Sequence, residues 1–204
     1  MTDTPSAPLP ASIHIFVVSH TNVGKTALVR TLLGKDVGEV QDAPDVTQTV
    51  TPYELVADET VGTLQLWDTP GFGDTARLLR RLRQSDQPIR WVMVQMWDRY
   101  VNRPLWCSQQ AVKNVREEAD IVLYLVDASQ RPDDMPYVDM EMEILSWIGK
   151  PVVLLLNQTG APRAPEEEMA EEVVWSQQLK RFPVVKRALN LDAFARCWVQ
   201  EGEL

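Results

Sequence analysis

Short apolar runs alternate with amphipathic segments along the chain, and each kind recurs several times. Runs rich in Val, Ile and Leu predict buried strands, whereas apolar residues three and four positions apart predict helices. The predicted strands cover residues 13–18, 49–57, 61–67, 120–126, 151–156 and 182–186. The predicted helices cover residues 27–33, 75–84, 107–119, 133–149, 166–181 and 194–199. This alternation predicts an α/β fold with a mostly parallel sheet, one antiparallel edge strand and helices on both faces.

The loop between the first strand and the first helix ends in Gly-Lys-Thr. Its sequence from residue 19 to residue 26 is Ser-His-Thr-Asn-Val-Gly-Lys-Thr. A buried strand, a tight turn of this kind and a helix predict a phosphate-binding loop, in which backbone N–H groups point at the phosphates. Lys25 adds positive charge at the outer phosphates, and the Thr26 hydroxyl is a ligand for Mg²⁺. The loop residues predicted to bind nucleotide are His20, Thr21, Asn22, Val23, Gly24, Lys25, Thr26 and Ala27.

The first position of this loop departs from the usual pattern, because Ser19 stands where glycine is usual. Glycine permits dihedral angles and a close backbone approach that a Cβ atom hinders. We expect serine to be tolerated if its φ angle is negative.

A second element follows the strand at residues 61–67, which runs into Asp68-Thr69-Pro70-Gly71. An acidic residue at a strand end and a turn to glycine are what a nucleoside-triphosphate switch needs. The Asp68 carboxylate reaches Mg²⁺ through water, and the Gly71 N–H senses the third phosphate.

These residues together resemble a known family. Asn-Val-Gly-Lys-Thr, a loop threonine and then Trp-Asp-Thr-Pro-Gly look like the small GTPases of the Era and TrmE type. Residues 19–71 resemble most closely the N-terminal G domain of bacterial GTPase-like proteins whose C-terminal part has no assigned function. The resemblance implies a P-loop NTPase fold, binding of GTP and GDP, hydrolysis of the γ-phosphate and Mg²⁺ as cofactor. It also implies that Thr47 is the switch threonine that binds Mg²⁺, with Thr49 as the competing candidate.

Two residues bear on hydrolysis. Many GTPases place a water-orienting glutamine after the switch glycine, but Phe72 stands there and cannot polarise water. In potassium-activated relatives an asparagine at the position of Asn22 helps to bind K⁺, whose charge stabilises the transition state. The residues predicted to act in catalysis are therefore Lys25, Asn22 and Thr47, in a GTPase that is slow or is activated by K⁺ or a partner. Asp74 either orients water or, as the simpler interpretation, caps a helix.

The region at about 75–119 reads as an insertion after the switch glycine. It contains a strongly basic helix, an aromatic segment from Trp91 to Trp106 and a second helix. The aromatic segment has two interpretations: core packing of an enlarged domain, or an apolar surface that contacts another domain, a twin subunit or a membrane face.

The strand at residues 151–156 ends in Asn157-Gln158-Thr159-Gly160. GTPases carry Asn-Lys-x-Asp here, and the aspartate pairs with guanine. Asn157 matches and Gln158 replaces the lysine, so both are predicted nucleotide-binding residues, but Gly160 replaces the aspartate. Losing this charged contact costs a few kcal/mol of base discrimination. Asp192 lies where GTPases place a weak base-contacting loop, and helix capping is its alternative role.

Length, charge and composition exclude several other classes of protein. The 204 residues suffice for one domain, and the net charge of -9 argues against nucleic-acid binding as the main activity. Two cysteines indicate no disulfide framework or metal site and favour the cytoplasm. No apolar run reaches the ~20 residues of a transmembrane helix, and no signal peptide is evident. Residues 1–12 are expected to be a disordered leader, and residues 13–204 a G domain, minimal or cut from a longer protein.

The predicted function is a guanine-nucleotide-binding switch with slow or stimulated hydrolysis. One alternative is a degenerate nucleotide-binding interaction module, favoured by Ser19, Phe72 and Gly160. Another is an ATP-using P-loop enzyme. Expected partners are GTP and GDP, and a C-terminal domain, a homodimer or an effector at Trp91–Trp106.

Overall fold

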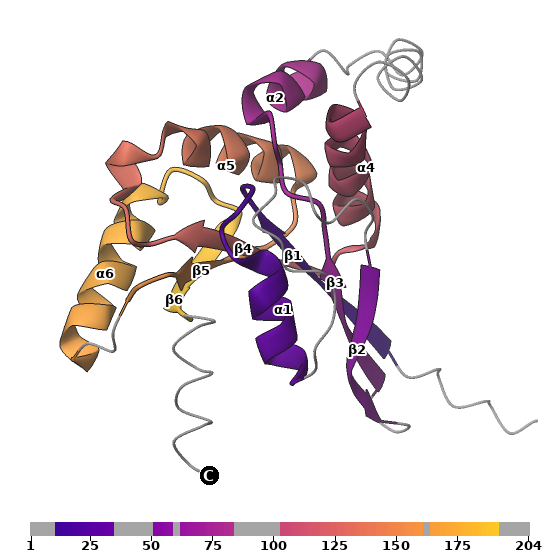
Figure 1. The fold of residues 1–204 in the computed structure, drawn as a ribbon, viewed down its shortest axis with the longest axis horizontal. Coiled ribbons are helices and arrows are strands. Elements are labelled where there is room, and N and C mark those ends of the chain that lie inside the picture. Colours follow the sequence, from indigo (N-terminus) through magenta and orange to yellow (C-terminus); the bar gives the residue numbers. More distant parts are fainter. Residues whose placement is uncertain (1–10, 35–50, 59–61, 84–102, 161–163, 192–204) are drawn as a thin grey trace, which may run out of the picture.

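The computed structural model describes residues 11–34, 51–58, 62–83, 103–160 and 164–191 (Figure 1). The strands are β1 (Ala11–Ser19), β2 (Thr51–Asp58), β3 (Gly62–Asp68), β4 (Ile121–Asp127), β5 (Val152–Asn157) and β6 (Val185–Asn190). The helices are α1 (Lys25–Leu33), α2 (Thr75–Arg83), α4 (Arg103–Glu118), α5 (Pro136–Ile148) and α6 (Pro165–Gln178), with a short 3-10 helix at Pro132–Asp134.

The strands form one six-stranded sheet in the order β2-β3-β1-β4-β5-β6. Only β2 is antiparallel to its neighbour among these strands, and it lies at the edge beside β3. Both the α/β class and the antiparallel edge strand predicted from the sequence are therefore confirmed. A parallel sheet needs crossover helices that cover its two faces, and the described helices lie on both.

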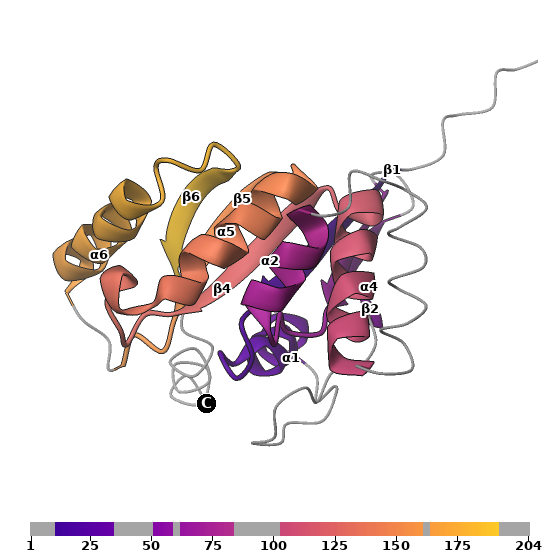
Figure 2. The same cartoon turned by 90° about the horizontal axis from the view of Figure 1, so that it is seen from above.

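Helix α1 covers one face of the sheet, where Leu28 and Val29 pack with Val17, Leu66 and Leu125. Helices α2, α4, α5 and α6 cover the opposite face, which Figure 2 shows from above. The division follows the strand period of two, because successive side chains of β1 and β4 point to opposite faces.

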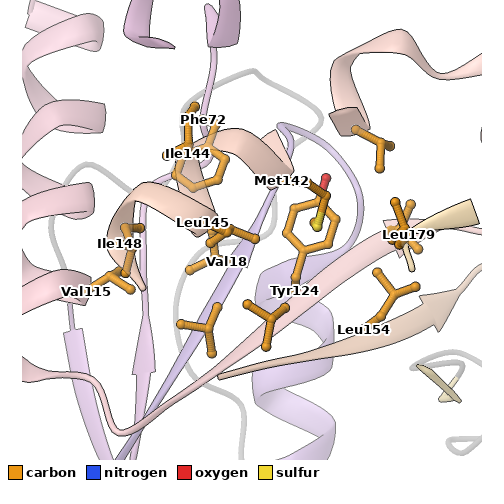
Figure 3. Close-up of a cluster of buried hydrophobic side chains, with 14 of the residues drawn as sticks. Val18, Phe72, Val115, Tyr124, Met142, Ile144, Leu145, Ile148, Leu154 and Leu179 are labelled. Carbon is orange, nitrogen blue, oxygen red and sulfur yellow. The ribbon is translucent and has the colours of Figure 1, made fainter. Parts of the chain in front are cut away.

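The larger core lies under α5. Figure 3 shows Val18, Tyr124 and Leu154, from three neighbouring strands, in one cluster with Leu145 of α5 and Phe72 of the loop before α2. All five side chains are buried. Phe72 thereby fixes the start of α2 to the hydrophobic core.

Several boundaries differ from the sequence prediction. Strand β6 covers residues 185–190 instead of 182–186, because Pro183 has no N–H to donate to a ladder. The segment predicted as one helix at 133–149 divides at Pro136, which stands at the first position of α5. Strand β1 begins at Ala11, two residues before the expected start of the domain, and α4 begins at Arg103 instead of Cys107.

Several predicted segments lie outside the described residues. They are residues 1–10 of the leader, Thr47 and Thr49, Trp91 and Trp97, Asp192 and the final helix. Trp106 lies on α4 and is half-buried. No described helix combines the length and the apolar character needed to span a membrane.

Candidate nucleotide-binding site

The predicted site residues meet at the carboxyl edge of the sheet. Ser19, Asp68 and Asn157 are the last residues of β1, β3 and β5. Parallel pairing of β1 with β3 brings the loop after Ser19 beside the segment after Asp68. Ligands of open α/β sheets bind at this edge, because the loops that follow parallel strands converge there.

The loop after β1 turns tightly into α1. Asn22 and Gly24 both have left-handed backbone conformations, with φ angles of 63° and 90°. Asparagine and glycine are the residues that adopt this conformation at least cost. Lys25 is the first residue of α1, so the positive end of the helix dipole and its free N–H groups face the loop. The local geometry is that of a phosphate-binding loop.

Ser19 fits at the first loop position because its φ angle is not positive, as expected. Asn22 and Gln158 are the only non-glycine residues with positive φ in the part of the chain that the structure describes, so Ser19 needs no glycine-like conformation. Its side chain is buried, and its Oγ donates to the carbonyl oxygen of His20 at 2.7 Å. The serine is thus accommodated inside the loop.

Lys25, Thr26 and Asp68 form the polar centre of the site. The Lys25 Nζ donates to Oδ1 of Asp68 at 2.6 Å, and the Thr26 Oγ1 lies 3.3 Å from Oδ2 of the same carboxylate. Lys25 and Asp68 are both buried. A hydroxyl and a carboxylate that converge in this way supply the oxygen ligands that Mg²⁺ prefers, so the residues present fit this ion.

Within the described ranges, no group of three or more His, Cys, Asp or Glu side chains lies close enough together to hold a metal ion.

Gly71 lies directly against the phosphate loop. A Cβ atom on Gly71 would lie 3.0 Å from Thr21 Cγ2 and 3.2 Å from the Thr21 Cα and N atoms. The next residue, Phe72, donates its N–H to the Ser19 carbonyl oxygen at 3.1 Å. The segment after β3 is therefore in contact with the loop at two places, and a side chain at position 71 would crowd Thr21.

Asn157, at the end of β5, contacts the phosphate loop at Val23, away from Gly71. Its side-chain Nδ2 donates to the Val23 carbonyl oxygen at 2.8 Å, and its backbone oxygen accepts from Ala128 N at 2.7 Å. Gln158 has a φ angle of 60° and is partly exposed. Gly160 is exposed, with a φ angle of 85°, and its Cβ position is open. The structure therefore brings Asn157 to the loop but places no carboxylate at position 160.

Asp74 has the simpler of its two predicted roles. Its Oδ1 accepts from the Arg77 backbone N–H at 3.0 Å, which is the bond of a helix N-cap.

The sequence analysis missed a buried carboxylate, Glu141 on α5. Its Oε1 accepts from Thr75 at 2.9 Å and lies 2.6 Å from His20 Nδ1, and its Oε2 accepts from Tyr124 at 2.5 Å. Burial, and then the charge and hydrogen bond of Glu141, raise the pKa of Tyr124 well above its ordinary value. Burial and the charges of Glu141 and Asp127 raise the pKa of Tyr137 to about 12.

A sequence signal for this residue exists. Glu141 shares one helical face with Val138, Met142 and Leu145, all of them buried. An acidic residue on an apolar face indicates a buried carboxylate with partners.

The family relationship rests on the length of the match. A family model described as "50S ribosome-binding GTPase" matches residues 14–158, which is well over half of the chain and includes the phosphate loop, Asp68, Gly71 and Asn157, but ends before Gly160. The chain belongs to this GTPase family. The phosphate loop, Asp68 and Gly71 therefore lie in a P-loop GTPase domain of the Era type.

Individual relatives agree with the family. GTPase Der from Geobacter metallireducens is 28% identical over 162 residues, which are 75% of this chain and 28% of that protein. GTPase Era from Pseudomonas fluorescens is 24% identical over 186 residues, covering 88% of this chain and 52% of that protein. The chain thus spans between a quarter and about half of the length of these relatives.

Solved structures show the same fold. Era from Aquifex aeolicus bound to GDP and aluminium fluoride superposes with a TM-score of 0.63 at 18% identity, covering 89% of this chain and 51% of that one. Era bound to MgGDPNP and a segment of 16S ribosomal RNA gives a TM-score of 0.61 at 19% identity, covering 90% of this chain and 52% of that one.

Proposed function

We propose that this domain is a guanine-nucleotide switch that binds GTP and GDP and hydrolyses the γ-phosphate slowly by itself. The convergence of Lys25, Thr26 and Asp68 beside Gly71 carries this proposal. These groups belong to the phosphate loop and to the segment that would sense the third phosphate, and they are already in contact.

The phosphates lie against the N-terminus of α1, where the N–H groups of loop residues 20–27 donate to phosphate oxygens. Lys25 leaves Asp68 and pairs with the outer phosphates. Thr26 directly, and Asp68 through water, would hold Mg²⁺, with Thr47 as a further proposed ligand from outside the described residues. When bound, Mg²⁺ neutralises negative charge on the phosphate oxygens.

Hydrolysis transfers the γ-phosphoryl group to water, and GDP leaves with the oxygen of the broken bond. The chain does little to activate that water, because the Phe72 side chain is buried in the core and cannot orient it. Asn22 supports a role for K⁺, since its side chain is exposed beside the loop. We therefore propose that turnover is slow and rises with K⁺ or with a partner.

Guanine selection is the weakest part of the site. Asn157 has its side-chain amide committed to the loop carbonyl of Val23, and position 160 offers no carboxylate. Gln158 remains beside the base as the proposed replacement for the usual lysine. The family match supports GTP over an ATP-using enzyme. The open position at Gly160 favours the second candidate, an interaction module with weak binding of nucleotide.

The comparisons support some of the proposed partners. The relatives are longer than this chain, which supports a further C-terminal domain in the whole protein, and a bacterial source. The family description names the 50S ribosome and one Era structure contains ribosomal RNA, so a ribosomal particle is a partner to test, although the charge of -9 argues against direct RNA contacts. A homodimer or effector at Trp91–Trp106 and a cytoplasmic location complete the proposal.

Calorimetric titration with GTP, GDP and ATP in Mg²⁺ and KCl tests the proposal. We expect micromolar binding of GTP and GDP and much weaker binding of ATP. Equal binding of ATP would show that the base is not selected, and binding of no nucleotide would overturn the switch.

The role of K⁺ is tested by turnover in KCl and in NaCl. Asn22→Gly is the matched variant, because glycine keeps the positive φ angle and removes only the side chain. We expect KCl to raise turnover in the native protein and to have less effect in the variant. Equal rates in both salts would remove the role proposed for Asn22.

A further inference from the structure

Glu141 is a charged residue in the hydrophobic core. Its side chain is fully buried on α5, at a position where the apolar pattern of the helix calls for an aliphatic residue. Burying a carboxylate is costly unless hydrogen bonds compensate for lost water. Its neighbours are therefore informative about why it is there.

Three elements converge on this one carboxylate. His20 of the phosphate loop and Thr75, the first residue of α2, share the same oxygen, Oε1, at 2.6 Å and 2.9 Å. Tyr124 of β4 donates to the other oxygen at 2.5 Å. The His20 ring also stacks on Tyr137 of α5, with ring centroids 4.2 Å apart. The loop and the helix that follows the switch glycine are thus bridged by one atom.

A second set of contacts also connects the phosphate loop to the segment before α2. Gly71 contacts Thr21 of the loop, and Phe72 N donates to Ser19. Only three residues separate Gly71 from Thr75. A shift of Gly71 relative to the loop therefore changes the position of Thr75 against an acceptor that His20 also uses.

We propose that Glu141 is a positioning residue, which couples the phosphate loop to α2 and thereby sets how strongly the switch prefers GTP over GDP. The inference rests on the proposed nucleotide binding. The Thr75–Glu141–His20 bridge holds α2 so that Gly71 stays against the loop, where the third phosphate is sensed. Loss of the bridge weakens binding of the triphosphate and leaves the diphosphate nearly unaffected.

The test compares the affinities of GDPNP and GDP, measured by calorimetry on the full chain. Thr75→Val removes the hydroxyl, and Thr75→Ser retains it. Tyr124→Phe is the matched control, because it removes a bond to the same carboxylate from a strand in the sheet and not from the loop or α2. We expect Thr75→Val to lower the GDPNP affinity relative to GDP about 5- to 10-fold, the lower part of the usual range of coupling between sites.

We expect Thr75→Ser to restore the native ratio, and Tyr124→Phe to change it less than twofold while lowering the melting temperature. An unchanged ratio in Thr75→Val, or the same change in Tyr124→Phe, would overturn the coupling and leave nucleotide binding standing. A native protein that binds neither nucleotide would overturn the proposed function together with this inference.

Hydrogen exchange gives a second readout on the same proteins. We expect GDPNP to protect the amides of α2 more than GDP does in the native chain, and this difference to shrink in Thr75→Val and in Glu141→Gln. Glu143→Gln is the control for Glu141→Gln, because Glu143 pairs with Arg83 across the same two helices at the surface. Equal protection of α2 by both nucleotides in the native chain would contradict the coupling.

Discussion

The Nζ of Lys25 and Oδ1 of Asp68 are 2.6 Å apart, and both side chains are buried. Under the proposed function, Asp68 would help to hold Mg²⁺ and Lys25 would pair with the phosphates. We therefore expect a Mg²⁺–nucleotide complex to separate the pair and to give each group a new partner of opposite charge.

Asp68→Asn should uncouple nucleotide binding from Mg²⁺. The amide cannot hold Lys25 as an ion pair or replace the carboxylate beside the metal. The ratio of the GTP affinity with Mg²⁺ to that without Mg²⁺ measures the contribution of the ion. We expect this ratio to be about 10-fold or more smaller in the variant than in the native protein, since the lost interaction is charge-assisted. Titrations with and without a chelator measure this effect.

The same variant should lose stability without ligand, by about 3 kcal/mol, because a buried charge is left unpaired. Asp127→Asn is the control, because Asp127 ends β4 at the same edge of the sheet and its side chain bonds Ser129 and Gln130 of the following turn. An equal loss of Mg²⁺ dependence in both variants would contradict the role of Asp68.

Gly71→Ala should move the switch segment away from the loop. The added Cβ meets the Thr21 backbone at 3.2 Å, which rigid neighbours cannot relieve without a shift. We expect GDPNP binding and hydrolysis to fall about 10-fold or more, and GDP binding to change little, as for an interaction made only with the third phosphate. Parallel titrations with both nucleotides measure the difference.

Gly34→Ala is the control for this variant. Gly34 ends α1 with a φ angle of 60° and has open space at its Cβ position. Alanine there should cost stability through backbone strain of roughly 1 kcal/mol without changing nucleotide preference. If Gly71→Ala and Gly34→Ala change the preference for GDPNP over GDP equally, steric contact at Gly71 is not the cause of the change.

Gly160→Asp should improve selection of guanine. The Cβ position is open and aspartate tolerates a positive φ angle better than most residues. The new carboxylate stands where other GTPases pair with guanine, and a charge-assisted contact should raise the preference for GTP over ATP by about 10-fold or more. Competition between GTP and ATP gives the ratio.

Gly160→Asn tests whether charge or shape is responsible, because the amide has the size of the carboxylate but lacks its charge. We expect it to give little gain. A similar gain from both side chains, or none from aspartate, would show that the base does not lie beside residue 160.

Tyr124 should make the domain less stable in alkali. Its pKa is raised in the folded chain by burial and by Glu141, whereas an unfolded tyrosine ionises near pH 10. Above about pH 10 the folded state retains a proton that the unfolded state loses, so the free energy of unfolding falls as the pH rises. Below that pH the contribution is complete. Urea unfolding at a series of alkaline pH values measures the slope.

Tyr124→Phe should flatten this dependence in part, because Tyr137, whose pKa is raised to about 12, still contributes. Tyrosinate absorbance provides an independent check, since Tyr124 should ionise only as the domain unfolds. Ionisation of Tyr124 in the folded protein near pH 10 would contradict its burial.

The sequence predicted the part of the site that local spacing determines. Ser19 to Thr26, Asp68 and Gly71 each belong to a short motif in which glycine, a hydroxyl or a charge must stand at a fixed offset. Their meeting at one sheet edge follows from parallel strands. Asn157 lies at the same edge for the same reason, because it ends a strand of the same sheet, and its role in nucleotide binding stays a prediction.

The rest depends on distant residues. Glu141 receives partners from residues 20, 75 and 124, and no local pattern pairs these positions. The boundary of β6 was missed because apolar residues at 182–185 suggested a strand, while pairing with β5 begins only at Val185.

Phe72 has a mechanical consequence. Its side chain lies in the core and its N–H is bonded to Ser19, so we expect this residue to move little when the nucleotide changes. We expect it to act as a pivot: a small displacement of Gly71 on one side becomes a rotation of α2 on the other. Phe72, which stands in place of a water-orienting glutamine, would thus convert a change of nucleotide into a change in the orientation of α2 at the surface.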